Sequence, residues 1–158
     1  MGPAELGKIK AIVGDYRQFK MKFIQFSKHC QQLARENNLP EIEVGEVRGN
    51  ATTWLVMDRS VMVLFGLVLA PDGTFRGRIN FDLPPGPGEE RPHTVFTLYF
   101  DRKGNMLEST SDAFSNRRII DEHDVPSILH RFLHPTPALC YPNYRSKSDF
   151  HPRSTGRP

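Results

Sequence analysis

The sequence of 158 residues has few cysteines and no long apolar run. Its two cysteines, Cys30 and Cys140, form no Cys-x-x-Cys pair, which favours reduced thiols in a cytoplasmic or nuclear protein. The longest near-apolar run, Val61 to Ala70, has the length of a strand and falls short of the roughly 18 residues that a membrane span needs. We therefore expect a protein that does not contact a membrane.

Common motifs of nucleotide-binding and hydrolytic enzymes are also missing. The sequence has no complete Gly-x-x-x-x-Gly-Lys-Ser/Thr loop, since Ile9 follows Gly7-Lys8, no Gly-x-Gly-x-x-Gly after a strand and no Gly-x-Ser-x-Gly elbow. His130 and His134 are four residues apart, a spacing that can serve one metal, but the acidic residue of a His-Glu-x-x-His helix is absent. We therefore expect no cofactor and no metal. An enzyme would have to use His93, His123, His130 and Asp121, for which the sequence shows no mechanism.

Positive charge is concentrated at the C-terminal end of the chain. Residues 141–158 hold four of the 21 Lys and Arg residues and one of the 18 Asp and Glu residues, so that residues 1–140 carry 17 of each sign. The segment is poor in aliphatic residues and rich in Ser, Pro and Arg, which predicts a disordered basic tail. The basic character of the protein therefore gives little support to a folded domain that binds phosphate.

The N-terminal region predicts a flexible lead-in followed by a long helix. Residues 1–14 contain several Gly and Pro residues and are expected to form the lead-in. From Asp15, a good N-cap, apolar residues recur at spacings of three and four up to Leu33. This pattern predicts a helix over 15–36 whose apolar side chains are Tyr16, Phe19, Phe23, Phe26, Cys30 and Leu33.

The middle of the chain predicts an antiparallel meander of four to six strands. The turn Ala70-Pro71-Asp72-Gly73 joins two strands into a hairpin, and Gly77 on the apolar side of the second strand indicates either a close approach of another group or a bulge. The proline-rich segment 84–92 predicts a stiff surface loop. Segment 110–122 remains open. The expected strands cover residues 41–48, 52–57, 61–69, 74–83, 93–101 and 106–109.

A second helix is predicted to start at the N-cap Asp124 and to end before Pro135. Its apolar side chains are Val125, Ile128, Leu129, Phe132 and Leu133. The elements together predict one α+β domain over residues 15–140, with a helix, a meander and a C-terminal helix.

One stretch resembles a known family. Residues 73–81, followed by Leu83-Pro84-Pro85 and by Pro92-His93-Thr94-Val95-Phe96, look like the third strand, proline-rich loop and fourth strand of the ubiquitin-conjugating (E2) fold. Residues 124–137 look like the helix that follows the active-site segment of that family, with its proline stop. Over residues 61–140 the chain thus resembles the E2 enzymes and their inactive relatives, the E2 variants and RWD domains.

The chain departs from the E2 pattern where the chemistry would lie. It has no His-Pro-Asn tripeptide and no cysteine between Thr94 and Leu139. Met106 falls near the expected position of the nucleophilic cysteine, and a thioether cannot form a thioester because that reaction needs a thiolate. The resemblance therefore implies a catalytically inactive member that acts as a scaffold or binding module.

Our leading hypothesis is a non-enzymatic module that binds another protein, a component of the ubiquitin pathway or of a multisubunit complex. A rigid loop presents a fixed surface at low cost in ordering, and exposed apolar residues on a helix suit a protein contact. The predicted contact residues are Met21, Ile24, Pro85, Pro87, Arg91 and Phe114.

The alternative is an accessory protein that binds nucleic acid. Cations on the polar side of the first helix, on one strand and in the tail could meet phosphate oxygens. Their predicted contact residues are Arg17, Lys28, Arg76, Arg78, Arg145 and Lys147.

Overall fold

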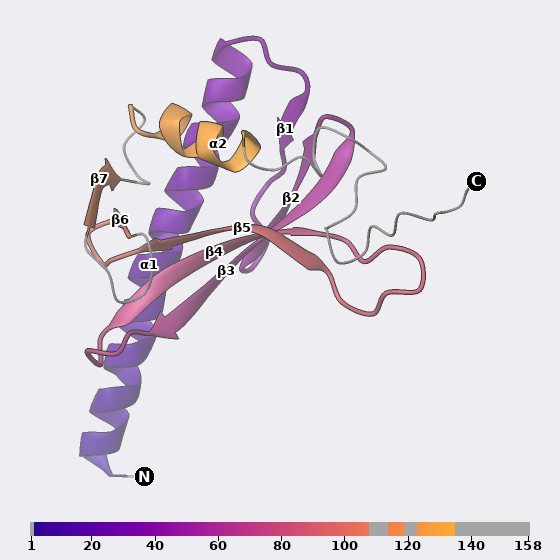
Figure 1. Cartoon of the computed structure of the whole chain (residues 1–158). Coiled ribbons are helices and arrows are strands. Elements are labelled where there is room, and N and C mark those ends of the chain that lie inside the picture. Colours follow the sequence, from indigo (N-terminus) through magenta and orange to yellow (C-terminus); the bar gives the residue numbers. More distant parts are fainter. Residues whose placement is uncertain (1, 108–113, 119–122, 135–158) are drawn as a thin grey trace.

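The protein has an α+β fold, which confirms the class expected from the sequence (Figure 1). The computed structural model describes residues 2–107, 114–118 and 123–134. In chain order it consists of a long helix α1 (Pro3–Glu36), an antiparallel sheet of seven strands and a short helix α2 (Val125–Leu133). Among the described residues, no helix combines the length and apolarity that crossing a bilayer requires.

Helix α1 begins at Pro3, well before the expected start at Asp15. The flexible lead-in predicted over residues 1–14 is therefore wrong from Pro3 onward. Proline in the first turn suits a helix, because its φ is already helical and its missing N–H would have no partner there. Asp15 lies inside the helix and, instead of capping it, pairs with Arg102.

The buried side of α1 matches the predicted stripe. Its buried side chains follow spacings of three and four, and Tyr16 and Leu33 pack against the same core while remaining partly exposed. The helix ends at Asn37, whose N–H donates to the Leu33 carbonyl, and the next residue, Asn38, has a φ of 53°. The buried residues are Phe19, Phe23, Phe26, Ser27, Cys30 and Ala34.

The strands form one antiparallel meander in which each strand pairs with the next along the chain. Six of them correspond to the predicted strands, and the seventh arises in the segment that the sequence left open. The strands are β1 (Ile42–Val44), β2 (Ala51–Val56), β3 (Arg59–Leu69), β4 (Phe75–Leu83), β5 (His93–Phe100), β6 (Asn105–Leu107) and β7 (Phe114–Arg118).

Both helices contribute aromatic side chains to one core on a single face of the sheet. The ring of Phe23 from α1 stacks on Phe65 of β3, with 5.5 Å between centroids. The ring of Phe132 from α2 lies 4.5 Å from Phe81 of β4, and Trp54 of β2 meets Phe81 edge to face at 5.3 Å. These rings are wholly or almost wholly buried. They stabilise the packing of α1 and α2 against the strands, because each aromatic side chain buries a large apolar area.

The close approach predicted at Gly77 is confirmed. Gly77 in β4 pairs with Phe100 in β5, and a Cβ added to it would lie 2.2 Å from the Phe100 ring. Only glycine leaves room for this ring, which itself stands 5.7 Å from the ring of Phe19 in α1. The glycine therefore allows the long helix to sit close to the sheet.

Candidate interaction surface

Helix α1 has a second regular face beside the buried one. Seven positions follow spacings of four or three, which places them within a sector of about 80° at 3.6 residues per turn. This sector is centred about 120° around the helix from the buried stripe. We call it the outer helix face, and it consists of Leu6, Lys10, Val13, Arg17, Met21, Ile24 and Lys28.

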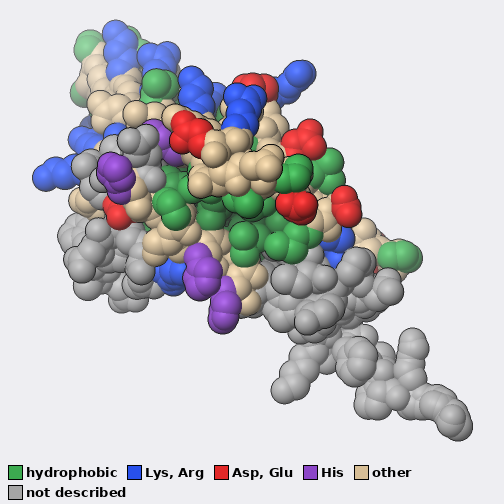
Figure 2. All heavy atoms as spheres, turned by 90° about the horizontal axis from the view of Figure 1, so that it is seen from above, with side chains coloured by type: hydrophobic (Ala, Val, Ile, Leu, Met, Phe, Trp, Pro, Cys, Tyr) green, Lys and Arg blue, Asp and Glu red, His purple; other side chains and the backbone are tan. Residues whose placement is uncertain are grey.

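The outer helix face is largely exposed and combines apolar with basic residues. Leu6 is 46%, Val13 39% and Met21 58% exposed, although all three are apolar. Lys10 and Lys28 are exposed as well, and none of the seven positions is acidic. Figure 2 shows Lys and Arg side chains gathered towards the upper left, whereas most Asp and Glu side chains in that view lie farther right.

The C-terminal end of this face borders a hollow. Ile24, which is half-buried, and Lys28 line a space of about 190 Å³ against the loop that follows β1. Gln31 separates this space from a larger groove of about 570 Å³ between α1 and β1, and its side-chain amide donates to the Val44 carbonyl. The face therefore leads from the projecting end of α1 to a concave region at the sheet edge.

The structure places four of the sequence-predicted residues on this one face. Met21 and Ile24, predicted for a protein contact, lie there between Arg17 and Lys28, predicted for nucleic acid. The two hypotheses therefore refer to the same surface.

The proline-rich loop lies elsewhere. Figure 1 shows residues 84–92 projecting on the side of the sheet away from α1, so that Pro85, Pro87 and Arg91, all exposed, do not extend the outer helix face. Glu89 orders this loop: its carboxylate accepts a hydrogen bond from the Gly86 N–H and lies 2.8 Å from Nε2 of His93. The loop is thus a separate exposed surface.

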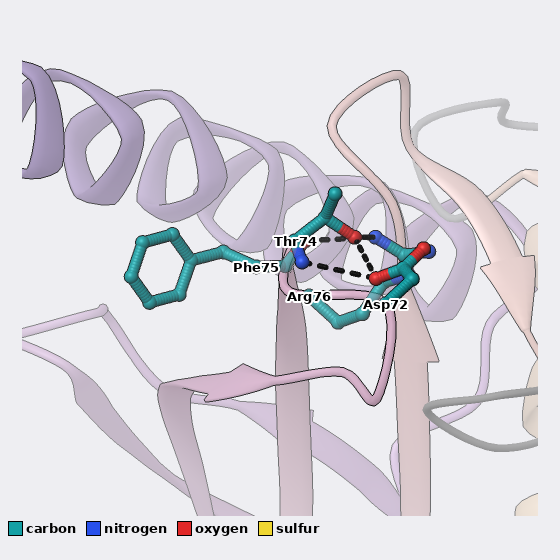
Figure 3. Close-up of polar contacts among 4 residues, drawn as sticks. All are labelled: Asp72, Thr74, Phe75 and Arg76. Carbon is teal, nitrogen blue, oxygen red and sulfur yellow. Dashed lines mark hydrogen bonds and ion pairs between the residues drawn. The ribbon is translucent and has the colours of Figure 1, made fainter.

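Arg76 is held by its own hairpin turn (Figure 3). Its guanidinium donates to the Asp72 carboxylate at 3.3 Å and also to the Thr74 hydroxyl, and only 17% of its side chain is exposed. The hydrogen bonds from Thr74, together with nearby Arg76, hold the pKa of Asp72 below its ordinary value. Arg76 is therefore engaged in forming the turn, which argues against its predicted role in phosphate binding.

The remaining predicted contact residues do not join the outer helix face. Arg78 is half-buried on β4, on the sheet face opposite the aromatic core. Phe114 lies in β7, where the structure describes the backbone alone. Arg145 and Lys147, like the rest of the predicted tail, lie outside the described residues.

Two sulfur groups that bear on the enzyme hypothesis, those of Met106 and Cys30, are buried. Met106, near the position of the E2 nucleophile in the resemblance, is a core side chain on β6 that is 2% exposed. Cys30 lies on the buried side of α1 and is fully enclosed. Burial raises the pKa of its thiol well above the ordinary value. A thiol that resists ionisation and has no solvent access is a poor nucleophile. Cys140 lies outside the described residues.

The histidines among the described residues lie in three places. His93 lies beside Glu89, while His123 faces a hollow lined in part by His29 of α1. His130 and His134 on α2 stack with 5.2 Å between ring centroids. Within the described part of the chain, no three His, Cys, Asp or Glu side chains are grouped to hold a metal ion. Asp121 lies outside the described residues.

Sequence reasoning missed Leu6, Lys10 and Val13, because Gly7 and Gly14 seemed to separate the first residues from the helix. A signal was present nonetheless. Leu6 and Val13 precede Arg17 and Ile24 at spacings that place all four on one side of a helix. Pro3 is a residue typical of the first turn of such a helix.

Comparisons of the chain with protein-family models, with curated proteins and with solved structures found no match.

Proposed function

We propose that this protein is a non-enzymatic scaffold module that binds another protein through the outer helix face of α1. The observation that carries the proposal is the exposure of Leu6, Val13 and Met21 along one side of a helix whose other side is filled by the core. Apolar side chains in a regular exposed row gain free energy when a partner removes them from water.

The resemblance to inactive E2 relatives supports the same proposal. An E2-like chain with Met106 in its core and an enclosed Cys30 has no accessible thiol among its described residues with which to carry ubiquitin. Such a member would act by binding alone, as a subunit of a complex or as an E2-variant-like partner in the ubiquitin pathway. Ubiquitin is therefore the first defined protein to test.

Site-specific photocrosslinking tests the proposal. We expect a photoreactive residue in place of Met21 of the full chain to give a discrete adduct with a partner protein in lysate of the source cells, or with purified ubiquitin. The same residue in place of Met62, a methionine on β3 that is 48% exposed, serves as the control. Finding no adduct at Met21, or the same adducts at both positions, would contradict the proposal.

A second candidate, nucleic-acid binding, is favoured by the cations Lys10, Arg17 and Lys28 on a face without an acidic residue. Binding through these cations would weaken steeply with salt, because each phosphate contact releases counterions. An electrophoretic mobility assay at rising salt concentrations tests it, with deletion of residues 141–158 separating the helix from the tail. Absence of a complex at low salt would dispose of this candidate.

A further inference from the structure

The geometry points to one kind of partner element: we propose that the outer helix face binds a single acidic amphipathic helix of another protein, laid along α1. The proposal rests on the protein-binding function proposed above and specifies the chemistry of the partner. It is carried by three features of the face, which are its spacing, its charge and the projection of its N-terminal end.

The spacing of the face is that of a helix-pairing seam. Apolar and basic side chains alternate from Leu6 to Met21, and Ile24 and Lys28 follow, all at intervals of three and four residues, the pattern by which two helices keep the same faces in contact. From Leu6 to Lys28 the seam spans about 33 Å at 1.5 Å per residue, enough for about six turns of a partner helix. The hollow beside Ile24 and Lys28 can receive a side chain from one end of that helix.

The charge of the face determines the sign of the partner. Lys10, Arg17 and Lys28 bring three positive charges and the face brings no negative one. A second copy of this chain would set these cations against one another, which costs free energy, whereas Asp and Glu beside an apolar seam would complement them. The partner helix should therefore be acidic, and pairing of two copies through this face is disfavoured.

The N-terminal end of the helix gives the partner room. Residues 3–13 are exposed, and Figure 1 shows this end of α1 extending past the sheet. Here Ile9 and Ile12, which are 43% and 49% exposed, continue the line of the buried stripe beyond the sheet and leave a second exposed apolar surface at this end. A helical segment this short is marginal by itself, so that a second helix packed against it would stabilise both.

A lipid surface fits the face less well than a helix does. An amphipathic helix that lies on a bilayer presents one continuous apolar sector with its cations at the borders. On the outer helix face Lys10 and Arg17 stand within the sector, directly between Leu6, Val13 and Met21. Cations at these places suit carboxylates of a facing helix.

The test uses the full-length protein and synthetic probes. A labelled three-heptad helical peptide with Leu at the seam and Glu beside it is compared with the same peptide carrying Lys in place of Glu, by fluorescence anisotropy. We expect the acidic peptide to bind at least about tenfold more tightly, since opposite charges complement the face. Equal affinity for the two peptides would overturn the proposal. So would tighter binding to phosphatidylserine vesicles or to an oligonucleotide.

Matched variants locate the site. Lys10→Glu with Arg17→Glu should weaken binding of the acidic peptide at least about tenfold, whereas Lys8→Glu with Arg48→Glu, an equal charge change at exposed positions off the face, should leave it within about twofold. Met21→Ser should weaken it and Met62→Ser should not. Equal effects of the face and control variants would overturn the proposal. A crosslinked partner at Met21 together with failure of the acidic peptide would reject this inference and leave the protein-binding function standing.

Discussion

The two parts of helix α1 both carry large apolar side chains at helical spacing but have opposite surroundings. Residues 15–36 place Phe19, Phe23 and Phe26 against the sheet, where they are almost wholly buried. Residues 3–14 contain four large aliphatic side chains, all substantially exposed, because the sheet does not reach them. Apolar residues at helical spacing thus build the core in one part and leave a surface for a partner in the other.

The largest expected effect is in the packed part. Phe23→Ala removes a fully buried ring that stacks on Phe65, and it should lower the free energy of unfolding by about 3–5 kcal/mol through lost burial and a cavity. Chemical denaturation measures it. Leu6→Ala, in the projecting part, should change stability by no more than about 0.5 kcal/mol. Similar losses at the two positions would show that the projecting part is also packed in solution.

The next effect concerns how closely α1 and the sheet approach. Gly77→Ala should destabilise the fold by about 1–3 kcal/mol, because the added Cβ meets the Phe100 ring that supports Phe19 of α1. Gly66→Ala is the control, because a Cβ added at Gly66 would lie 4.0 Å from the nearest neighbouring atom, on the Arg78 side chain. Denaturant midpoints of the two variants measure the difference. An unchanged midpoint for Gly77→Ala would mean that the ring can move aside at no cost.

A smaller effect of opposite sign is expected in the projecting part. Gly7→Ala should raise helix content and stabilise the protein by about 0.5–1 kcal/mol, because alanine loses less backbone entropy in a helix. A Cβ added at Gly7 would meet no neighbouring group within 4 Å, so the helix can accommodate alanine there. Circular dichroism and the denaturant midpoint measure it. A loss of helix content would contradict the picture of an unobstructed helix end.

The smallest predicted effect is a change in the pH dependence of stability at Asp72, next to the point where the two parts of α1 meet. Asp72 and the helix residues Asp15 and Phe19 border one hollow, and hydrogen bonds from Thr74 lower the Asp72 pKa from its ordinary value of 3.8. A carboxylate whose pKa is lower in the folded state stabilises the protein above its unfolded pKa, and this contribution is lost as the pH falls through the folded pKa. Asp72→Asn should therefore slightly reduce stability at neutral pH and flatten its decline in acid.

Denaturation at a series of pH values measures this effect, with Asp58→Asn, an exposed position in the β2–β3 turn, as the control. The small size of the effect follows from the full exposure of the Asp72 carboxylate, which water and salt screen. A stability curve with the same acid slope for the wild type and Asp72→Asn would refute the predicted linkage.

Much of the architecture could be predicted from local patterns. Alternation identified β4 and β5, an apolar run identified β3, the Pro71-Asp72-Gly73 turn joined β3 to β4, and helical spacing identified the packed part of α1. The start of α1 could not be predicted as well, because glycines at positions 7 and 14 lower helix propensity without preventing a helix. β7 was missed since its segment has no clear alternation.

The candidate surface was found only in part. Met21 and Ile24 were predicted as contact residues from their positions off the apolar stripe, but their placement on one face with Leu6, Lys10 and Val13 depends on one continuous helix from Pro3. Arg76, in contrast, was predicted as a contact residue, and the structure argues against that role. Its residue type suggested phosphate binding, whereas its neighbours Asp72 and Thr74 engage it within the turn.

The sequence alone determined the class of the fold and the order of its elements, because hydrophobic spacing and turn residues act over a few neighbouring positions. Only the tertiary structure decided which apolar side chains are buried and which remain exposed. Ile12 and Phe23 lie on the same side of α1 at helical spacing, and the difference between them is whether a strand lies opposite, which depends on how far the sheet extends along the helix.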